Sequence, residues 1–228
     1  MNSLFIIPII FGIIHLVEYA SYLSRIAGIK YNLKVLSYSV QQMFFVGTRF
    51  FFLALMPLIG YQIDSGISKD SYIYILYLSM LCASLSYILV IILKNSIINL
   101  NKKIFIKKTQ NKIRLNLNYK EFSFKGLLKY KKIYILSSIV FSGYSLGVFV
   151  AFYFALIYSD YSTTISQMSG IVNGFSTVLL TFILEPILAK NMDEDNEDVV
   201  NMIAALLFGR LLGVLILSPI LILFLSFF

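Results

Sequence analysis

Ionisable side chains stand inside a stretch that is otherwise apolar enough to cross a membrane. In "IIHLVEYASYLSRIAG", residues 13–28, His15, Glu18, Tyr22 and Arg25 follow one another at helical spacing, so they share one face of an α-helix. A charged side chain at the centre of a bilayer costs about 3 kcal/mol or more. We therefore expect this face to point into a helix bundle or a wet cavity. Because Glu18 and Arg25 lie two turns apart, each is expected to find its partner on another helix.

Three more charged residues fall within apolar segments: Arg49, Glu185 and Arg210. Two of them, Arg49 and Arg210, are expected to lie deep in the bilayer together with Glu18. Arg25 and Glu185 are close enough to a helix end to snorkel toward the cytoplasmic headgroups. The deep set therefore holds two arginines and one carboxylate.

This excess of guanidinium groups favours an anion that enters from outside the bundle. The planar fork of arginine matches phosphate oxygens, so Arg49, Arg210 and Arg25 are candidate ligands for a pyrophosphate headgroup. In the alternative interpretation, Glu18 pairs with one arginine while another arginine binds backbone carbonyls. The charges would then only hold the bundle together.

Glu18, His15 and Glu185 are the candidate charge-pairing and proton-coupling residues. His15 lies one turn from Glu18, so the two could share a proton, and either could titrate to couple transport to a proton gradient. The ordinary alternative is a histidine that makes hydrogen bonds in the packed interior.

The composition is that of a polytopic membrane protein. Among 228 residues, 59% are hydrophobic and 13% are charged, with a mean hydropathy of +0.84, which exceeds the values of soluble domains. Apolar runs of about 20 residues predict an all-α protein with six transmembrane helices, over 3–27, 35–58, 71–94, 133–158, 166–189 and 199–227. We expect one membrane domain, 1–228, whose first segment is retained as a helix because no small-residue cleavage pattern follows it.

The longest polar connection, residues 95–132, separates helices 1–3 (3–94) from helices 4–6 (133–227). It carries eleven Lys and Arg residues against the single carboxylate of Glu121. By the positive-inside rule this basic segment is cytoplasmic and both termini lie outside. It is expected to rest on anionic lipid. Its alternating runs "KKIFIKK" and "KIRLNLNYK" predict short strands or interfacial segments, and no compact basic module for nucleic-acid binding is present.

Three G-x-x-x-G motifs occur in the last three predicted helices, in "SGYSLG", "SGIVNG" and "FGRLLG". Two glycines on one helix face allow close helix packing in a membrane. We expect these helices to pack closely, either within one subunit or across a homo-oligomer. Three helices on each side of the basic segment would suit an inverted repeat, but the halves show no residue-level similarity.

No enzyme signature accompanies these features. The chain lacks H-E-x-x-H, G-x-S-x-G, P-loop and dinucleotide motifs, and one histidine cannot build the usual zinc triad. The single Cys82 excludes a multi-thiolate site within one chain. The acidic run "DEDNED", residues 193–198, could bind a divalent cation at the surface, although a solvated loop is the ordinary alternative. We therefore expect no cofactor and no resident metal.

Three stretches resemble the Amj family, the alternate lipid II flippases of bacteria: "IIHLVEYASYLSRIAG", "LEPILA" (184–189) and "DVVNMIAALLFGRLLGVLILSP" (198–219). The likeness covers the first and the last two predicted helices, about half the chain, without the basic segment. It implies a multi-pass protein of the bacterial cytoplasmic membrane that moves an undecaprenyl-pyrophosphate-linked saccharide from the inner to the outer leaflet for peptidoglycan synthesis. It assigns no residue a role, and it leaves open a related lipid-linked glycan as substrate.

Both arguments favour one mechanism. A cavity lined by helices 1, 2, 5 and 6 would hold the pyrophosphate against Arg49 and Arg210 while the prenyl tail stays in lipid. Glu18 would pair with an arginine when the site is empty, so that one anion replaces another. Two alternatives stay open: a non-transporting assembly partner of a glycan or cell-wall synthase, and an intramembrane transferase.

Overall fold

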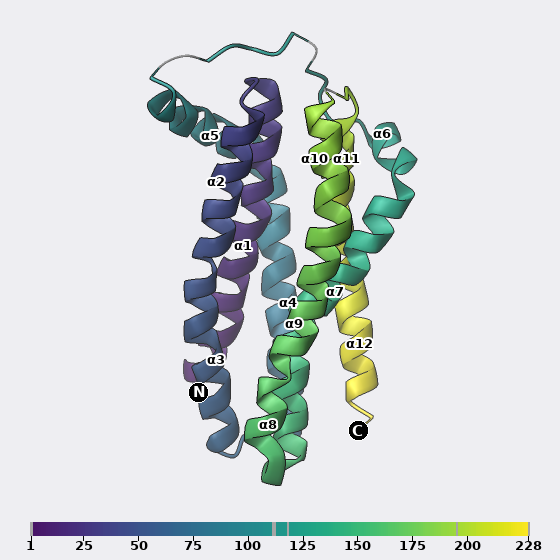
Figure 1. Ribbon diagram of the computed structural model, residues 1–228. Helices are drawn as coiled ribbons and strands as arrows, with labels where there is room; N and C mark the ends of the chain where they lie inside the picture. The colour runs from purple at the N-terminus through teal and green to yellow at the C-terminus, as the bar shows by residue number, and fades with distance from the viewer. Residues whose placement is uncertain (1, 111–112, 118, 195, 228) are drawn as a thin grey trace.

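The computed structural model describes residues 2–110, 113–117, 119–194 and 196–227, and within them all regular structure is helical. Six segments are long and apolar enough to cross a membrane, as predicted. They form an elongated bundle (Figure 1). The first four segments are α1 (Asn2–Lys30), α2 (Lys34–Gly47) with α3 (Arg49–Asp64), α4 (Lys69–Ile92) and α7 (Lys131–Ile157). The fifth comprises η1 (Ser159–Tyr161), α8 (Ser162–Gln167), α9 (Ser169–Leu179), η2 (Leu180–Leu184) and α10 (Glu185–Asp193), and the sixth α11 (Val199–Leu212), η3 (Gly213–Leu217) and α12 (Ser218–Leu225).

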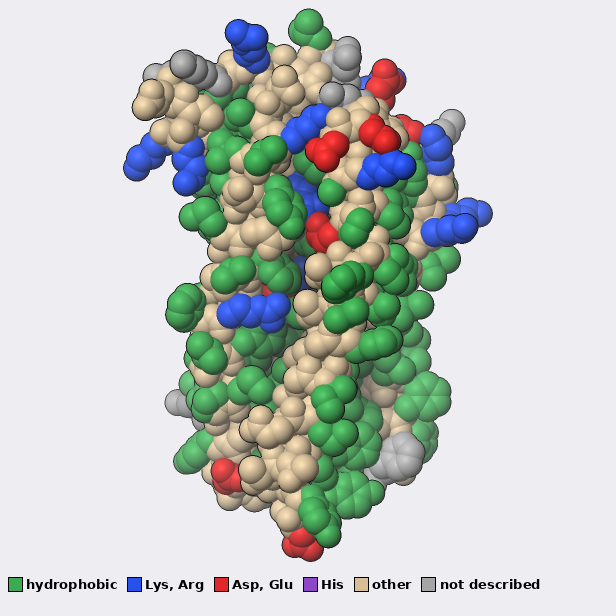
Figure 2. All heavy atoms as spheres, in the orientation of Figure 1, with side chains coloured by type: hydrophobic (Ala, Val, Ile, Leu, Met, Phe, Trp, Pro, Cys, Tyr) green, Lys and Arg blue, Asp and Glu red, His purple; other side chains and the backbone are tan. Residues whose placement is uncertain are grey.

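Helices α1 and α7 form the centre of the bundle. Helix α1 packs mainly against α4 and α2, and α7 packs mainly against α11, α9 and α8. Both chain ends lie at one end of the bundle, and α5 and α6 lie at the other (Figure 1). Lysine and arginine side chains gather at the α5 and α6 end, while hydrophobic side chains cover most of the remaining surface on the face shown (Figure 2). This pattern suits a bundle that spans a membrane.

Glycines bring α7 into close contact with two neighbouring spans. A Cβ atom at Gly209 or Gly213 would lie 2.2 or 2.4 Å from a backbone carbonyl oxygen of α7. At Gly143 and Gly147 it would lie 2.7 and 2.5 Å from side chains of α9. The predicted close packing is therefore confirmed within one chain for the first and third motifs. At the second motif, Gly170 and Gly174, a Cβ would meet nothing within 4 Å, so that prediction is wrong for contacts inside the subunit.

The last two spans are each interrupted by a π-helical turn followed by a proline. The turns are η2 and η3, and the prolines are Pro186 and Pro219, each at the start of the following α-helix. The surrounding sequences, "FILEPIL" at 182–188 and "LILSPIL" at 215–221, are near repeats of each other. Proline lacks the N–H of the helical ladder, and a π-turn inserts an extra residue. Both features weaken the local backbone and allow the helix to bend there.

The basic segment is more helical than its alternating pattern suggested. Residues 94–108 form α5 (Lys94–Lys108), and residues 124–129 form α6 (Phe124–Lys129), so the strand prediction for "KKIFIKK" is wrong. Ile98, Asn101 and Phe105 are the buried residues of α5, and their spacing of three and four residues is helical. Packing of this face against α1 overrides the local alternation. In "KIRLNLNYK", Lys112 and Asn118 lie outside the described residues.

Candidate functional site

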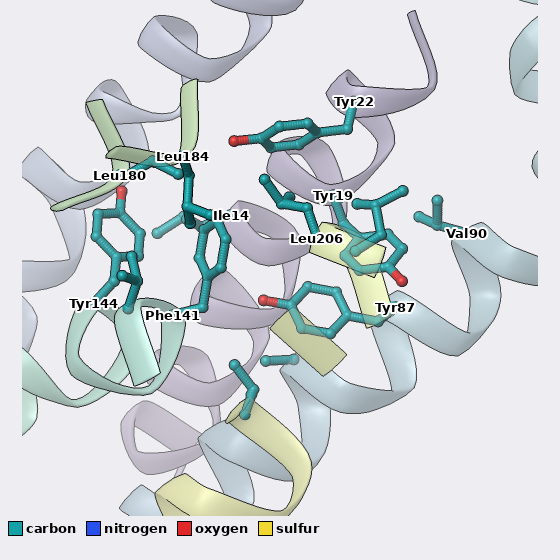
Figure 3. Close-up of a cluster of buried hydrophobic side chains, with 14 of the residues drawn as sticks. Ile14, Tyr19, Tyr22, Tyr87, Val90, Phe141, Tyr144, Leu180, Leu184 and Leu206 are labelled. Atoms are coloured by element: carbon teal, nitrogen blue, oxygen red, sulfur yellow. The ribbon is translucent and has the colours of Figure 1, made fainter. Parts of the chain in front are cut away.

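The polar face of α1 is buried at the centre of the bundle. His15, Glu18 and Arg25 have no exposed surface, and Tyr22 has almost none. The sequence placed these residues on one helical face, and the structure turns that face toward α4, α7, α10 and α11. In Figure 3 the hydroxyl groups of Tyr22 and Tyr87 both point toward the side where Leu184 and Phe141 lie. The prediction that each charge is paired by another helix is confirmed.

Glu18 of α1 forms an ion pair with Arg210 of α11, in which Arg210 Nη2 donates to Glu18 Oε2 and both side chains are 0% exposed. The Tyr144 hydroxyl of α7 donates to Glu18 Oε1 at 2.9 Å. Thr48 Oγ1 lies 3.0 Å from the same oxygen. The carboxylate is thus held by three other spans. Its charge is satisfied inside the protein, as a buried ion pair requires.

Arg210 is directed toward α1 by the contact of its neighbour Gly209 with α7. Its Nε donates to the Tyr87 hydroxyl at 2.9 Å, and the Phe141 ring lies 4.3 Å from its Cζ. Nη1 of Arg210 has no hydrogen-bond partner among the described residues. One edge of this guanidinium is therefore unsatisfied in a fully buried position, which costs free energy.

His15 contacts Tyr87 rather than Glu18. Its Nδ1 pairs with the Tyr87 hydroxyl, and its Nε2 has no partner among the described residues. Because Arg210 already donates to that hydroxyl, the tyrosine proton is available for donation to Nδ1, which suits a neutral imidazole. Among the described residues, His15 and Glu18 therefore share no direct hydrogen bond, although their spacing of one turn would allow one. Tyr87 instead joins His15 to Arg210.

A second ion pair links α1 to α10 nearer the basic end. Arg25 Nη2 donates to Glu185 Oε2, and the Tyr22 hydroxyl donates to Glu185 Oε1 at 3.2 Å. Arg25 is 0% exposed and Glu185 13% exposed. The prediction that Arg25 snorkels is wrong, because the carboxylate of α10 and the Tyr38 ring, 4.8 Å from Cζ, hold it inside. Its Nε and Nη1 have no partner in the described part of the chain.

Glu185 occupies the junction between the π-turn η2 and Pro186. Its side chain is 13% exposed, whereas that of Arg25 is fully buried. The pair thus sits where a span can bend and where its carboxylate has partial access to the surface.

Arg49 lies at the break between α2 and α3 and differs from the other two arginines. It is half-buried, and among the described residues it makes no ion pair with a carboxylate. Its Cζ lies 5.2, 5.8 and 5.6 Å from the ring centroids of Phe45, Phe52 and Tyr144. Aromatic faces attract a guanidinium, but they leave its hydrogen-bond donors free. Tyr144 connects this site to Glu18.

The site therefore has one centre and two adjoining groups. His15, Glu18 and Arg210 come together, Arg25 and Glu185 form the second group, and Arg49 joins the centre through Tyr144. Sequence reasoning missed Thr48, Tyr87 and Tyr144. A buried tyrosine hydroxyl needs a partner, but with sixteen tyrosines in the chain that signal selects none of them.

The acidic run before α11 forms ion pairs with residues of the basic segment. Glu197 pairs with Lys120, and Asp198 accepts from Lys129 Nζ at 2.6 Å and from the Tyr130 hydroxyl at 3.0 Å. The Lys129 hydrogen bond holds the pKa of Asp198 below its ordinary value. Asp195 lies outside the described residues. Within the described residues no group of three His, Cys, Asp or Glu side chains could hold a metal ion.

Comparison with known proteins gives two findings. The sequence model of the Amj family, described as "Alternate to MurJ", matches residues 93–225, more than half of the chain. The Lipid II flippase Amj of Bacillus subtilis (strain 168) is 28% identical over 99 residues, which are 39% of this chain and 37% of that protein. No solved structure matches.

The family match covers α5 to α12, with Glu185 and Arg210. It includes the basic segment, contrary to the expectation that this segment takes no part in the likeness. The match begins after residues 13–28 and after Arg49. The inclusion of the α1 charges and of Arg49 in the candidate site therefore rests on the geometry of the structure alone.

Proposed function

The chain belongs to the Amj family, and on that premise we propose that it is a flippase of the bacterial cytoplasmic membrane. Its substrate would be an undecaprenyl-pyrophosphate-linked saccharide, lipid II or a related precursor, moved from the inner to the outer leaflet for peptidoglycan synthesis. The name of the B. subtilis relative supports the class of substrate. The excess of Lys and Arg in residues 95–132 supports a cytoplasmic basic end and outer termini.

The observation that carries the proposal is the guanidinium of Arg49, which has no carboxylate partner in the described part of the chain. The arginine is half-buried at a break in a membrane span, and three aromatic rings surround it without satisfying its donors. A mobile anion is the partner that such a group lacks. We assign Arg49 as a contact for the pyrophosphate, with the prenyl tail remaining in the surrounding lipid.

Arg210 and Arg25 would also contact the pyrophosphate, each after its ion pair within the protein has opened. In the structure each is paired with a carboxylate of the chain, Glu18 or Glu185. Opening the bundle between α1 and the last two spans would let the pyrophosphate replace those carboxylates. Exchange of one anion for another limits the cost of separating a buried pair. The π-turns beside Pro186 and Pro219 are the places where those two spans can bend.

His15 is the proposed point of proton coupling. Its imidazole reaches Arg210 through Tyr87, so a proton on His15 would add positive charge beside the Glu18–Arg210 pair. We expect a proton gradient to change the flipping rate of the wild-type protein and to have no effect on His15→Gln. An equal response of both proteins would remove His15 from the mechanism.

The proposal is tested in liposomes that contain a fluorescent undecaprenyl-pyrophosphate saccharide and an impermeant quencher outside. The wild-type protein should expose inner-leaflet lipid, and Arg49→Gln should lose this activity because it keeps the fold but removes the free cation. Arg49→Lys, which keeps the charge without the planar fork, is the matched control and should retain part of the rate.

No exposure above that of empty liposomes would contradict the flippase. It would favour the non-transporting assembly partner, in which charge substitutions reduce complex formation instead. Product formation in detergent, where no leaflets exist, would favour a transferase.

A further inference from the structure

A polar cavity lies at the basic end of the bundle, apart from the buried charges. It has a volume of about 340 Å³ and is bounded by the last turn of α1, the first two turns of α5, the chain around 119–122 and the start of α11. Ligand pockets begin at about 300 Å³. The cavity is therefore large enough for a sugar phosphate but not for a prenyl chain.

Two lysines that line this cavity are more buried than most lysines at the basic end of the molecule. Lys30 and Lys94 are half-buried, whereas the four lysines farther along α5 are exposed. Among the described residues, neither Lys30 nor Lys94 forms an ion pair with a carboxylate. Partial burial without a counter-ion is unfavourable for an ammonium group. An anion in the cavity would supply what both side chains lack.

The remaining lining groups suit a hydroxyl-rich ligand. The amides of Asn95 and Asn99 offer both donors and acceptors, and the carboxylate of Glu121 offers only acceptors. A bare phosphate would be repelled by Glu121, while sugar hydroxyls can donate to it. The rings of Tyr119 and Phe122 provide flat apolar surface for a sugar face. Lys30 already lies 5.4 Å from the centroid of the Tyr119 ring.

The cavity lies at the basic end of α1, beyond Arg25 in the sequence. Ile26, which lines it, follows Arg25 directly in α1. Lys30 lies five residues beyond Arg25, which is about 7.5 Å along a helix axis. The cavity and the Arg25–Glu185 pair are therefore separate sites near the basic half of α1.

We propose that this cavity is a recognition site for a phosphorylated saccharide headgroup. Lys30 and Lys94 contact the phosphates, and Asn95, Asn99 and Glu121 bind the sugar hydroxyls. This inference rests on the proposed function, because it assigns the cytoplasmic loading site of the same substrate. It differs from that function in predicting binding that does not need transport.

The absence of tryptophan from the chain makes a selective test possible. Phe122→Trp places a single fluorescent reporter at the cavity, and Tyr158→Trp, at the opposite end of the bundle, is the matched reporter. Both proteins are placed in neutral nanodiscs and titrated with three probes. These are a polyprenyl-diphosphate monosaccharide, soluble UDP-N-acetylglucosamine and phosphatidylglycerol.

The saccharide lipid should change the fluorescence of the Phe122→Trp protein saturably, and Tyr158→Trp should not respond. In the same reporter background, Lys30→Gln and Lys94→Gln should each weaken binding about tenfold, the effect of one charge-assisted hydrogen bond. Lys107→Gln, which removes the same charge from the exposed end of α5, should change it less than twofold. UDP-N-acetylglucosamine should bind more weakly than the lipid but with the same dependence on Lys30.

Three outcomes would overturn the assignment. Phosphatidylglycerol could match the saccharide lipid, which would make the cavity a general anionic-lipid site. Lys107→Gln could weaken binding as much as Lys30→Gln, which would reduce the lysines to a surface anchor. UDP-N-acetylglucosamine alone could bind, which would indicate a soluble ligand.

Binding without flipping would contradict only the proposed function, and flipping with unchanged rate in Lys30→Gln and Lys94→Gln would contradict only this inference.

Discussion

Helix α1 makes two ion pairs with the second half of the chain, and they differ in their access to water. Glu18 and Arg210 are both 0% exposed, while Glu185 in the pair with Arg25 is 13% exposed. Three further hydroxyl groups surround the first pair, and one tyrosine hydroxyl supports the second. The comparison suggests that the inner pair holds the bundle together and that the outer pair can open.

Their surroundings support this division. Glu185 follows a π-turn and precedes Pro186, so its helix can bend at the ion pair itself. Arg210 lies in the last turn of α11, before η3, but its neighbour Gly209 packs directly against the backbone of α7. A rigid contact and a flexible one therefore follow each other along the same face of α1. Substrate entry is expected to begin at the flexible one.

Breaking the inner pair should have the largest effect on stability. Glu18→Gln leaves the Arg210 charge buried without its counter-ion, which costs about 3–5 kcal/mol. We expect a large decrease in the temperature of thermal unfolding in detergent. The double variant Glu18→Gln/Arg210→Met removes both charges and should recover most of that loss. A double variant less stable than Glu18→Gln would contradict this expectation, because it would show that Arg210 stabilises the bundle through its other contacts, with Tyr87 and Phe141.

Breaking the Arg25–Glu185 pair should have a smaller effect on stability, but it should separate α10 from α1 more often. Glu185→Gln keeps an acceptor for Arg25 and Tyr22, and partial access to water limits the cost to about half of that for Glu18→Gln. Hydrogen exchange should rise in α10 and in the second half of α1 but not in α11. Equal exchange in α10 and α11 would contradict the division into a rigid and a flexible contact.

Much of this arrangement was predictable from residue types and spacing. The six apolar runs and the helical spacing of His15, Glu18 and Arg25 correctly predicted the bundle and a buried polar face. The partners of Glu18 and Arg25 could not be predicted, because pairing across helices depends on helix rotation and depth. The position of Arg25 near the end of the first predicted helix suggested that its side chain extends toward the headgroups. The ion pair with Glu185 keeps it inside the bundle instead.

The basic end was the harder region to predict. The alternating pattern of residues 102–108 fits a strand locally, but the buried positions Ile98, Asn101 and Phe105 are three and four residues apart. Contact with α1 therefore decides in favour of α5. The lysines of this end all look alike in the sequence. Only the structure separates Lys30 and Lys94, which line a cavity, from those exposed to solvent.

The smallest effect is expected at the ion pair of exposed Lys129 with half-buried Asp198. The Lys129 hydrogen bond lowers the pKa of Asp198, so its contribution is fully present above the ordinary carboxyl pKa and is lost as the pH falls through the lowered value. Asp198→Asn should lower the unfolding temperature by less than about 2 °C near neutral pH. Once the pH is below the lowered pKa of Asp198, the variant and the wild-type protein should unfold alike. A difference that persists in acid would mean that the contact acts through packing.

The central claim is that the deep charges serve transport and not only stability. Its most direct test is the flipping rate of the fluorescent undecaprenyl-pyrophosphate saccharide in liposomes that contain the folded double variant Glu18→Gln/Arg210→Met. We expect the double variant to remain folded and to lose flipping, because no guanidinium remains at the centre to receive the pyrophosphate. Flipping at the wild-type rate by the folded double variant would show that Glu18 and Arg210 have a purely structural role.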